Sequence, residues 1–419
     1  MTKQASTAAQ TRLGGFLAYA ARQQEARETI QAMLAPPADI TPWRGILAVP
    51  PGSPMDKLLG VFHDETDIPL ELPFFAVLHF VSGLLLSKRV KIQGACVDVY
   101  PDLWTIVLAP SGAGKTMAHN LIAKAAPVKS SFPEVASGAR FIEAFQQHNF
   151  GLWFQDEFAQ KLKQIETPNS PLADVKEYLL RAYGYDKIER STKKETITIE
   201  EPCLGILGLN TPESFFKALS PESLLDGFAA RFAYVIAERD PARPMLDFPL
   251  YNIERLTQAA QVAFDKIQAL PLPAAYLVGA EAETAFRESF RLLCSGEIPE
   301  AFYRRILFRA FKYATLYHVI LGKASDTLDA EDMGWAARVS SLHLSDMRRI
   351  AEQHGLLGDA LKVVRKVRRL RTLGSKPLTA RFIQQRVRGD HRVAVRPAFR
   401  NRLRRGPYLL TRHRGKGHG

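Results

Sequence analysis

Residues 103–116 read Leu-Trp-Thr-Ile-Val-Leu-Ala-Pro-Ser-Gly-Ala-Gly-Lys-Thr, and the rest of the chain is organised around this stretch. Its first six residues form an apolar run that is typical of a buried parallel strand. Residues 109–116 follow the pattern of a phosphate-binding loop, or P-loop, except that Ala109 stands where Gly is usual. Helical spacing follows in residues 117–125. A strand, a glycine-rich turn and a helix N-terminus together present backbone N–H groups to an anion, so we predict a nucleoside triphosphate site.

Each position of this loop has an expected part in binding the nucleotide. The Lys115 ammonium is expected to reach the β- and γ-phosphates, and the Thr116 hydroxyl to bind Mg²⁺. The backbone of the remaining loop residues would surround the phosphates; these residues are Ala109, Pro110, Ser111, Gly112, Ala113 and Gly114. The alternative is an ordinary Gly/Ser-rich turn between a strand and a helix. The predicted cofactors are ATP and Mg²⁺.

A second apolar run, residues 151–155, ends in Asp156 and Glu157, about 40 residues after the loop. Carboxylates at the carboxyl end of a parallel strand lie where α/β sheets bind ligands. We expect Asp156 to hold Mg²⁺, directly or through water, and Glu157 to orient and deprotonate the attacking water. Taken alone, such a pair is more typical of a solvated strand end, but the loop upstream favours the catalytic interpretation.

Two further residues stand at the ends of predicted elements. The apolar run 204–210 ends in Asn210, which is placed to contact the γ-phosphate or the attacking water as a sensor residue. Arg231 lies between a predicted helix, 221–230, and a predicted strand, 232–237, where it could complete a neighbouring subunit's site as an arginine finger. The alternative for Asn210 is a simple turn at the end of the strand. The alternative for Arg231 is a structural charge on the surface.

Residues 187–199 predict a β-hairpin, because Thr and Ile alternate along its second arm as in a half-buried strand. Its tip would carry Arg190, Lys193 and Lys194, which we expect to contact nucleic acid; an ordinary solvated tip is the alternative. The helical stretch that follows residue 250 contains Arg304, Arg305 and Arg309. One of these three could contact the phosphates from within the same chain, unless they form a solvated helix face.

The charge of the chain is spread unevenly. Residues 361–419 hold 19 of the 56 Lys and Arg and one of the 43 Asp and Glu, so this tail carries +18 and the preceding residues −5. Such a distribution indicates an anionic polymer as partner, most simply nucleic acid. The tail is predicted to be winged-helix-like, with a basic third helix suited to a DNA groove. Its candidate DNA contacts are Arg396, Arg400, Arg402, Arg404 and Arg405.

The sequence predicts an α/β fold in four segments. These are an N-terminal helix and Pro-rich linker over residues 1–60, an ATPase core over 61–248, a helical lid over 249–357 and the basic tail over 358–419.

The remaining features predict a soluble, cytoplasmic protein in a reducing compartment. Cys96, Cys203 and Cys294 lack metal-ligand or redox spacing and are expected to be buried as small apolar side chains. The N-terminus has no apolar signal core. The most apolar stretch, residues 74–86, is too short to span a bilayer, so no membrane partner is expected.

The ordered set of motifs resembles that of AAA+ motors of the superfamily 3 and minichromosome-maintenance helicase type. It is more closely similar to the helicase-like ATPases of prophages and plasmids called YfjI-like. The resemblance covers about residues 70–350. The segments that carry it are 103–116, 150–158, 207–212 and 226–232.

This resemblance implies an AAA+-like P-loop NTPase core and assigns a role to each matching residue. Lys115 and Thr116 would bind the nucleotide, and Asp156 and Glu157 would bind the metal and the attacking water. Asn210 would act as the sensor residue, and Arg231 as an arginine finger that acts on a neighbouring subunit. It also implies a homo-oligomeric ring, often a hexamer, around single-stranded DNA, with the hairpin tip facing the channel. Residues 1–60 are too short for a primase, so priming would need a separate primase or polymerase.

The sequence therefore predicts an ATP-dependent DNA translocase or helicase that replicates a phage, a plasmid or an integrated element. One alternative is a DNA-binding ATPase switch that loads or recruits a replisome without unwinding. A second alternative is a P-loop kinase that modifies a small molecule, but the basic tail, Asn210 and Arg231 argue against it.

Overall fold

The computed structural model describes most of residues 49–353. The described residues are 49–94, 98–191, 196–219, 223, 227–240, 243, 248, 250–293 and 300–353, with 21, 24 and 28 near the start of the chain. They belong almost entirely to one compact unit, Met1–Arg349; of the second unit, Ile350–Gly419, only the first four residues are described. The predicted winged-helix-like tail and its five arginines lie outside the described residues, as do Lys193, Lys194, Cys96 and Cys294.

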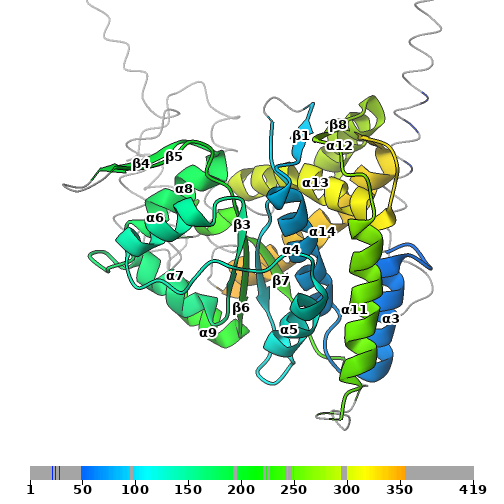
Figure 1. The fold of residues 1–419 in the computed structure, drawn as a ribbon, viewed down its shortest axis with the longest axis horizontal. Coiled ribbons are helices and arrows are strands. Elements are labelled where there is room, and N and C mark those ends of the chain that lie inside the picture. Colours follow the sequence, from blue (N-terminus) through cyan, green and yellow to red (C-terminus); the bar gives the residue numbers. More distant parts are fainter. Residues whose placement is uncertain are drawn as a thin grey trace, which may run out of the picture. The chain divides into compact units, whose positions relative to one another are not determined.

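A parallel sheet lies at the centre of the fold (Figure 1). Its described strands run in the order β3 (Gly151–Gln155), β6 (Leu204–Asn210), β2 (Trp104–Leu108), β7 (Ala233–Ile236). β2 and β6 are buried at every residue, as their continuous apolar sequences predict for strands covered on both faces. The α/β class and the parallel arrangement are thereby confirmed.

All four strands point the same way, so the sheet has one edge where the strands begin and one where they end. We call these the amino edge and the carboxyl edge. In β2, Leu108 is opposite Asn210 of β6 and Ile236 of β7, which brings three strand ends to the carboxyl edge. Loops that leave this edge are the usual ligand-binding parts of a parallel α/β sheet.

Helices cover both faces of the sheet (Figure 1). On one side lie α3 (Pro54–Glu65), α4 (Glu71–Ser87), α5 (Lys115–Ala125) and α11 (Ile253–Gln268); on the other lie α6 (Gly138–Gln147), α7 (Phe158–Glu166), α8 (Val175–Gly184) and α9 (Pro212–Ala218). α4 is buried on nearly all sides and packs on β3, β6 and α5, which explains its uniformly apolar sequence.

The lid segment is not purely helical, and it is not a separate unit. Besides α11 it contains α12 (Ala280–Leu293), α13 (Glu300–Leu321) and α14 (Ala330–Gln353). It also contributes β8 (Ala275–Val278) and β9 (Thr327–Leu328), which join β1 (Lys91–Gln93) in a second parallel sheet. β1 therefore lies outside the central sheet, although it precedes β2 in the chain. α11 packs on α3 and α5, so residue 248 does not divide two compact units.

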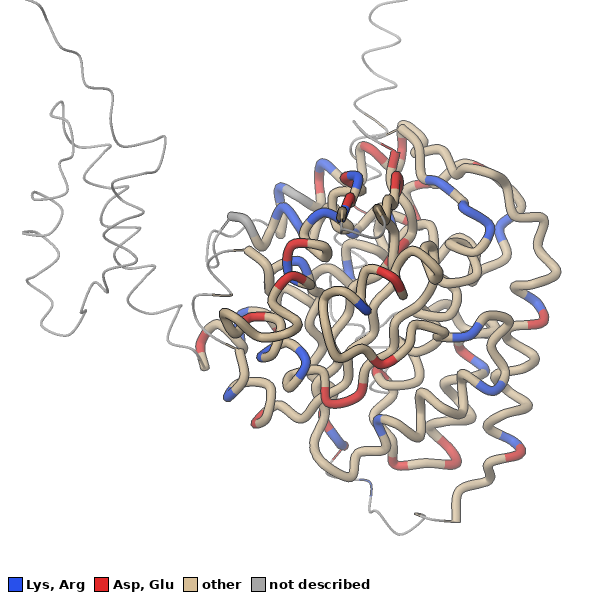
Figure 2. Tube along the Cα trace, turned by 60° about the vertical axis from the view of Figure 1, so that its left-hand side comes forward, with Lys and Arg blue, Asp and Glu red and all other residues tan. Residues whose placement is uncertain are grey.

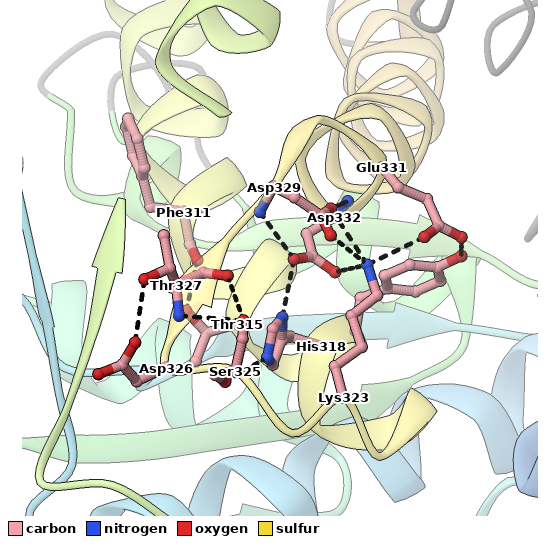
Figure 3. Close-up of polar contacts among 11 residues, drawn as sticks. Phe311, Thr315, His318, Lys323, Ser325, Asp326, Thr327, Asp329, Glu331 and Asp332 are labelled. Atoms are coloured by element: carbon pink, nitrogen blue, oxygen red, sulfur yellow. Dashed lines mark hydrogen bonds and ion pairs between the residues drawn. The ribbon is translucent and has the colours of Figure 1, made fainter. Parts of the chain in front are cut away.

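A polar cluster fixes β9 between α13 and α14 (Figure 3). Lys323 lies within 2.9 Å of carboxylate oxygens of Asp329, Glu331 and Asp332. Asp329 and Asp332 also accept hydrogen bonds from each other's backbone N–H at 3.0 Å, which caps the first turn of α14. The buried His318 ring lies 2.8 Å from Asp332 Oδ2 through Nδ1 and 2.8 Å from the Ser325 carbonyl oxygen through Nε2.

The helix α3 was not predicted, because its prolines were assigned to a linker. Ser53 caps it by accepting a hydrogen bond from the Asp56 N–H at 3.1 Å, and Pro54 stands in its first turn. Proline is favoured there because its φ is already helical and its missing N–H would have no helical acceptor.

Charges of both signs are interspersed along the described trace (Figure 2). The basic excess of the sequence, which lies in residues 361–419, is therefore not a property of this part of the chain. Cys203 is fully buried, as expected for a small apolar side chain. In the described part of the chain, no helix is both long and apolar enough to cross a membrane.

Candidate functional site

The 109–116 loop leaves β2 at the carboxyl edge and leads directly into α5. Gly114 is the N-cap residue of α5, and no described side chain caps the first turn of this helix. Gly112 and Gly114 both have φ of +76°, the left-handed region that favours glycine. A Cβ on Gly114 would also lie 2.7 Å from the Ile68 side chain. Glycine is thus required at this position.

Lys115 Nζ donates hydrogen bonds to the carbonyl oxygens of Ala109 at 3.0 Å and Pro110 at 2.9 Å. Burial lowers the pKa of Lys115, and the negative charges of Asp156, Glu157 and Glu213 oppose that shift. The ammonium therefore lies in the field of three carboxylates. Glu213 stands in the first turn of α9, directly after β6.

The hydroxyl of Thr116 donates a hydrogen bond to Asp156 Oδ2 at 2.6 Å. The other oxygen of Asp156 accepts a hydrogen bond from the Glu157 N–H at 2.9 Å. Because β6 lies between β2 and β3, this contact joins two non-adjacent strands across the carboxyl edge. The structure thus brings the predicted hydroxyl and the predicted carboxylate together.

The residues present fit a magnesium ion. Thr116 and Asp156 offer hard oxygen donors, the type that Mg²⁺ prefers. With Mg–O distances of about 2.1 Å, neighbouring oxygens of an octahedral shell lie about 3 Å apart, so this pair needs to open only slightly. Among the described residues there is no group of three or more His, Cys, Asp and Glu that could hold a metal ion, so phosphate or water would supply the other ligands.

Glu157 begins α7 with left-handed dihedrals, φ 51° and ψ 42°. For a residue with a Cβ this conformation costs on the order of 1–2 kcal/mol. The side chain is exposed, and within the described part of the chain it makes no hydrogen bond or ion pair. The strained turn thus presents an unengaged carboxylate beside Asp156.

Asn210 is fully buried at the end of β6. Its Oδ1 accepts a hydrogen bond from the Thr211 N–H at 2.8 Å, while its Nδ2 has no hydrogen-bond partner among the described residues. A buried donor without an acceptor costs about 1–3 kcal/mol. The Nδ2 group of Asn210 is therefore able to donate a hydrogen bond to an acceptor at the carboxyl edge, where Lys115 also lies.

Arg231 lies at the opposite, amino edge of the sheet. It stands two residues before Ala233, which is opposite Thr105 of β2, whereas the loop follows Leu108. At roughly 3.3 Å per residue the strand alone separates the two by more than 10 Å. Arg231 Nη1 donates to the Gly227 carbonyl at 2.7 Å, and its guanidinium lies 5.4 Å from the Tyr183 ring centroid. Arg231 therefore cannot act on the loop of its own chain.

Two of the three lid arginines, Arg305 and Arg309, do not join the site either. Arg309, only 1% exposed, donates hydrogen bonds to the backbone carbonyls of Ala230 and Arg231. Arg305 donates to the Gly227 carbonyl. These two side chains bind backbone carbonyls in and next to the turn η1 (Ala229–Arg231). They therefore neither contact the phosphate site of their own chain nor form a solvated helix face.

The predicted hairpin is present, with β4 (Ile188–Ser191) and β5 (Thr196–Ile199) paired in antiparallel fashion. Arg190 is opposite Ile197. The hairpin begins near the amino edge, where Tyr185 donates a hydrogen bond of 2.5 Å to Asp102, just before β2. Hairpin and Arg231 thus share the edge remote from the loop.

Sequence reasoning missed three groups beside the loop. Glu213 looks like an ordinary acidic residue in a helix first turn. His119 stacks on Phe154 of a distant strand. Arg239 pairs with Asp67 at 2.8 Å beside Ile68, and these two residues are too far apart in the sequence to suggest a contact. No local pattern marks any of them.

No family model matches the chain, and no curated protein is significantly similar to it. The function is therefore inferred from the geometry of the site and from the sequence motifs.

Proposed function

We propose that this chain is a P-loop ATPase with an AAA+-like core, and that it uses ATP to move along DNA as a translocase or helicase. The observation that carries the ATPase assignment is the 2.6 Å contact between Thr116 and Asp156. It joins the end of the glycine-rich loop to the carboxylate of a second strand, as metal-dependent phosphate chemistry requires.

Each residue at the carboxyl edge has a part in this proposal. Lys115 exchanges its two loop carbonyls for phosphate oxygens, and the first turn of α5 adds N–H donors and its dipole. Thr116 and Asp156 hold Mg²⁺, which neutralises charge on the β- and γ-phosphates when bound.

Glu157 accepts a proton from the attacking water. Its strained turn holds the carboxylate next to the metal ligand without committing it to another partner. The Nδ2 of Asn210 donates to the γ-phosphate or to the same water, which satisfies a donor that is otherwise buried without an acceptor.

The DNA assignment is supported by different features. Residues 361–419 carry +18, which suits a polyanion, and Arg190 lies on the hairpin. Arg231 is remote from its own loop, so a finger role requires a neighbouring copy. The proposed partners are single-stranded DNA in a channel, duplex DNA at the tail, further copies of this chain in a ring such as a hexamer, and a separate primase or polymerase.

The test uses the purified full chain, with Lys115→Ala as control. We expect ATP hydrolysis that single-stranded DNA stimulates, together with ATP-dependent strand displacement on a forked duplex. Hydrolysis and DNA binding without displacement would favour the loading switch. Phosphate transfer to a small acceptor, independent of DNA, would favour a kinase. A folded chain that binds no nucleotide would overturn the proposal.

A further inference from the structure

His119 and Phe154 form a ring stack next to the proposed metal ligands. Their ring centroids are 3.5 Å apart with 8° between the planes, the closest contact of the described ring pairs. His119 belongs to α5, which starts at the loop, and Phe154 belongs to β3, which ends at Gln155, one residue before Asp156. The stack therefore joins α5 to β3 close to the place where Thr116 contacts Asp156.

The spacing of these four residues makes the two contacts neighbours. His119 is three residues after Thr116, so both side chains lie on one face of α5. Phe154 is two residues before Asp156, which directly follows β3, and both side chains contact α5. The pairs Thr116–Asp156 and His119–Phe154 are therefore neighbouring contacts between one face of α5 and the end of β3.

The ring of His119 is flat, rigid and uncharged at neutral pH. Burial lowers the pKa of His119 to about 4, so it carries no charge at neutral pH. The side chain is 5% exposed and lies between Phe154 and the Phe80 ring of α4, whose centroid is 5.4 Å away. Its Nδ1 lies 3.2 Å from the Asn120 side-chain oxygen, and its Nε2 has no partner among the described residues.

We propose that His119 is a positioning residue for the metal site: its stack on Phe154 sets the separation of Thr116 and Asp156. This inference rests on the proposed function. β3 pairs with β6 and not with β2, so no direct backbone ladder fixes the distance from the start of α5 to the end of β3. A flat ring of fixed thickness supplies that spacing, and a neutral one adds no repulsion toward a divalent cation.

The test compares two variants of similar apolar volume in the full chain. His119→Phe keeps a flat ring that can stack, whereas His119→Leu fills the space without a ring face. The readouts are Mn²⁺ affinity with ATP present, measured by electron paramagnetic resonance, and ATP affinity in EDTA. Outer-shell changes typically cost about 10–100-fold in metal affinity.

We expect His119→Leu to weaken Mn²⁺ binding about tenfold, at the low end of that range, and to leave ATP affinity in EDTA unchanged. His119→Phe should stay close to the wild type. Leu121→Ala serves as control, because Leu121 is buried on another face of α5, and it should lower stability without changing Mn²⁺ affinity.

Equal Mn²⁺ affinity in His119→Leu and wild type would overturn this inference, as would an equal loss in Leu121→Ala. Both outcomes leave the proposed function standing if the wild type binds ATP with Mn²⁺. A wild type that binds neither would overturn the proposed function and this inference together.

Discussion

Lys115 Nζ donates a hydrogen bond to the Pro110 carbonyl oxygen at 2.9 Å, so the loop's own backbone receives the ammonium that we assign to the phosphates. A second carbonyl, that of Ala109, accepts at 3.0 Å. Phosphate oxygens are anionic and make stronger, charge-assisted hydrogen bonds than neutral carbonyls do. Nucleotide binding should therefore draw Lys115 out of its loop.

Lys115→Ala should weaken ATP binding by about 100-fold, because two hydrogen bonds to charged groups are worth about 3 kcal/mol together. Titration with a fluorescent ATP analogue measures this directly. The fold should be unaffected, since among the described residues the Lys115 side chain donates only to carbonyls of its own loop. Circular dichroism checks the fold. An affinity equal to that of the wild type would show that Lys115 does not hold the phosphates.

Glu157→Gln should bind ATP normally but hydrolyse it about 10²–10⁴-fold more slowly, because an amide cannot take the proton of the water. Glu213→Gln is the matched control, since this carboxylate also acts on Lys115 but follows β6 and is not next to Asp156 in the chain. We expect it to keep most of the turnover. The assignment fails if Glu157→Gln hydrolyses ATP at the wild-type rate.

Arg231→Ala should leave ATP binding nearly intact and reduce hydrolysis strongly, because arginine fingers supply about 10³–10⁵ in rate. Mixing it with Lys115→Ala tests whether the finger acts between subunits. One pairing then contains an intact loop facing an intact Arg231, so the mixture should recover some turnover. If both variants assemble and no ratio recovers activity, Arg231 has only its structural role beside Tyr183.

Removal of residues 359–419 should weaken DNA binding and flatten its salt dependence, while unstimulated ATP hydrolysis persists. Each phosphate contact adds about 0.9 to the log–log salt slope on duplex DNA and about 0.7 on single strands. The removed segment carries 19 Lys and Arg against Asp359 and Asp390, a net charge of +17 that exceeds the +13 of the whole chain, whereas every residue of the candidate site precedes it. An unchanged affinity and slope would mean that the tail has another partner.

The stability of the fold should fall as the pH rises past His318's pKa. Burial alone would lower the pKa of His318, but its bond to Asp332, the charge of Asp332 and the Ser325 carbonyl outweigh burial and raise it (Figure 3). A raised pKa means that the fold favours the protonated ring. The protonated His318 ring stabilises the fold fully at pH values below the pKa of this group in the unfolded chain, about 6.5. This stabilisation is lost as the pH rises above the pKa of the group in the folded chain.

Urea unfolding between pH 6 and 9 measures this effect. The free energy of unfolding should fall more steeply for the wild type than for His318→Gln, which cannot gain the proton. Burial raises the pKa of Asp346 to about 7, and this group also makes stability fall with rising pH, but mainly between pH 4 and 7. Identical slopes for the two proteins above pH 7 would exclude His318 as the cause.

Much of the fold could be predicted from the sequence where a local pattern decides the structure. β2 and β6 are continuous apolar runs because both faces are covered, and such runs are visible without a structure. Ser137 caps α6 by accepting from the Arg140 N–H at 3.3 Å, a local interaction for which serine is favoured at a helix start.

Elements whose existence depends on distant partners could not be predicted. β9 is two residues long and forms only because Leu328 meets Val278 of β8, so it carries no periodic signal. The same distinction holds for the site. Thr116, Asp156, Glu157 and Asn210 follow local motifs and lie at one edge of the sheet. His119 carries no such mark, because its stack on Phe154 arises from tertiary packing.

The opposite placement of Arg231 and the 109–116 loop gives each copy of the chain a direction. A two-fold dimer would have to include both edges of the sheet in one self-complementary patch. Where Arg231 of one copy contacts the loop of the next and the reverse contact is not made, the contacts repeat head to tail. If the repeat closes, every loop has its arginine. If it stays open, the result is a filament that ends in a loop on one side and in Arg231 on the other.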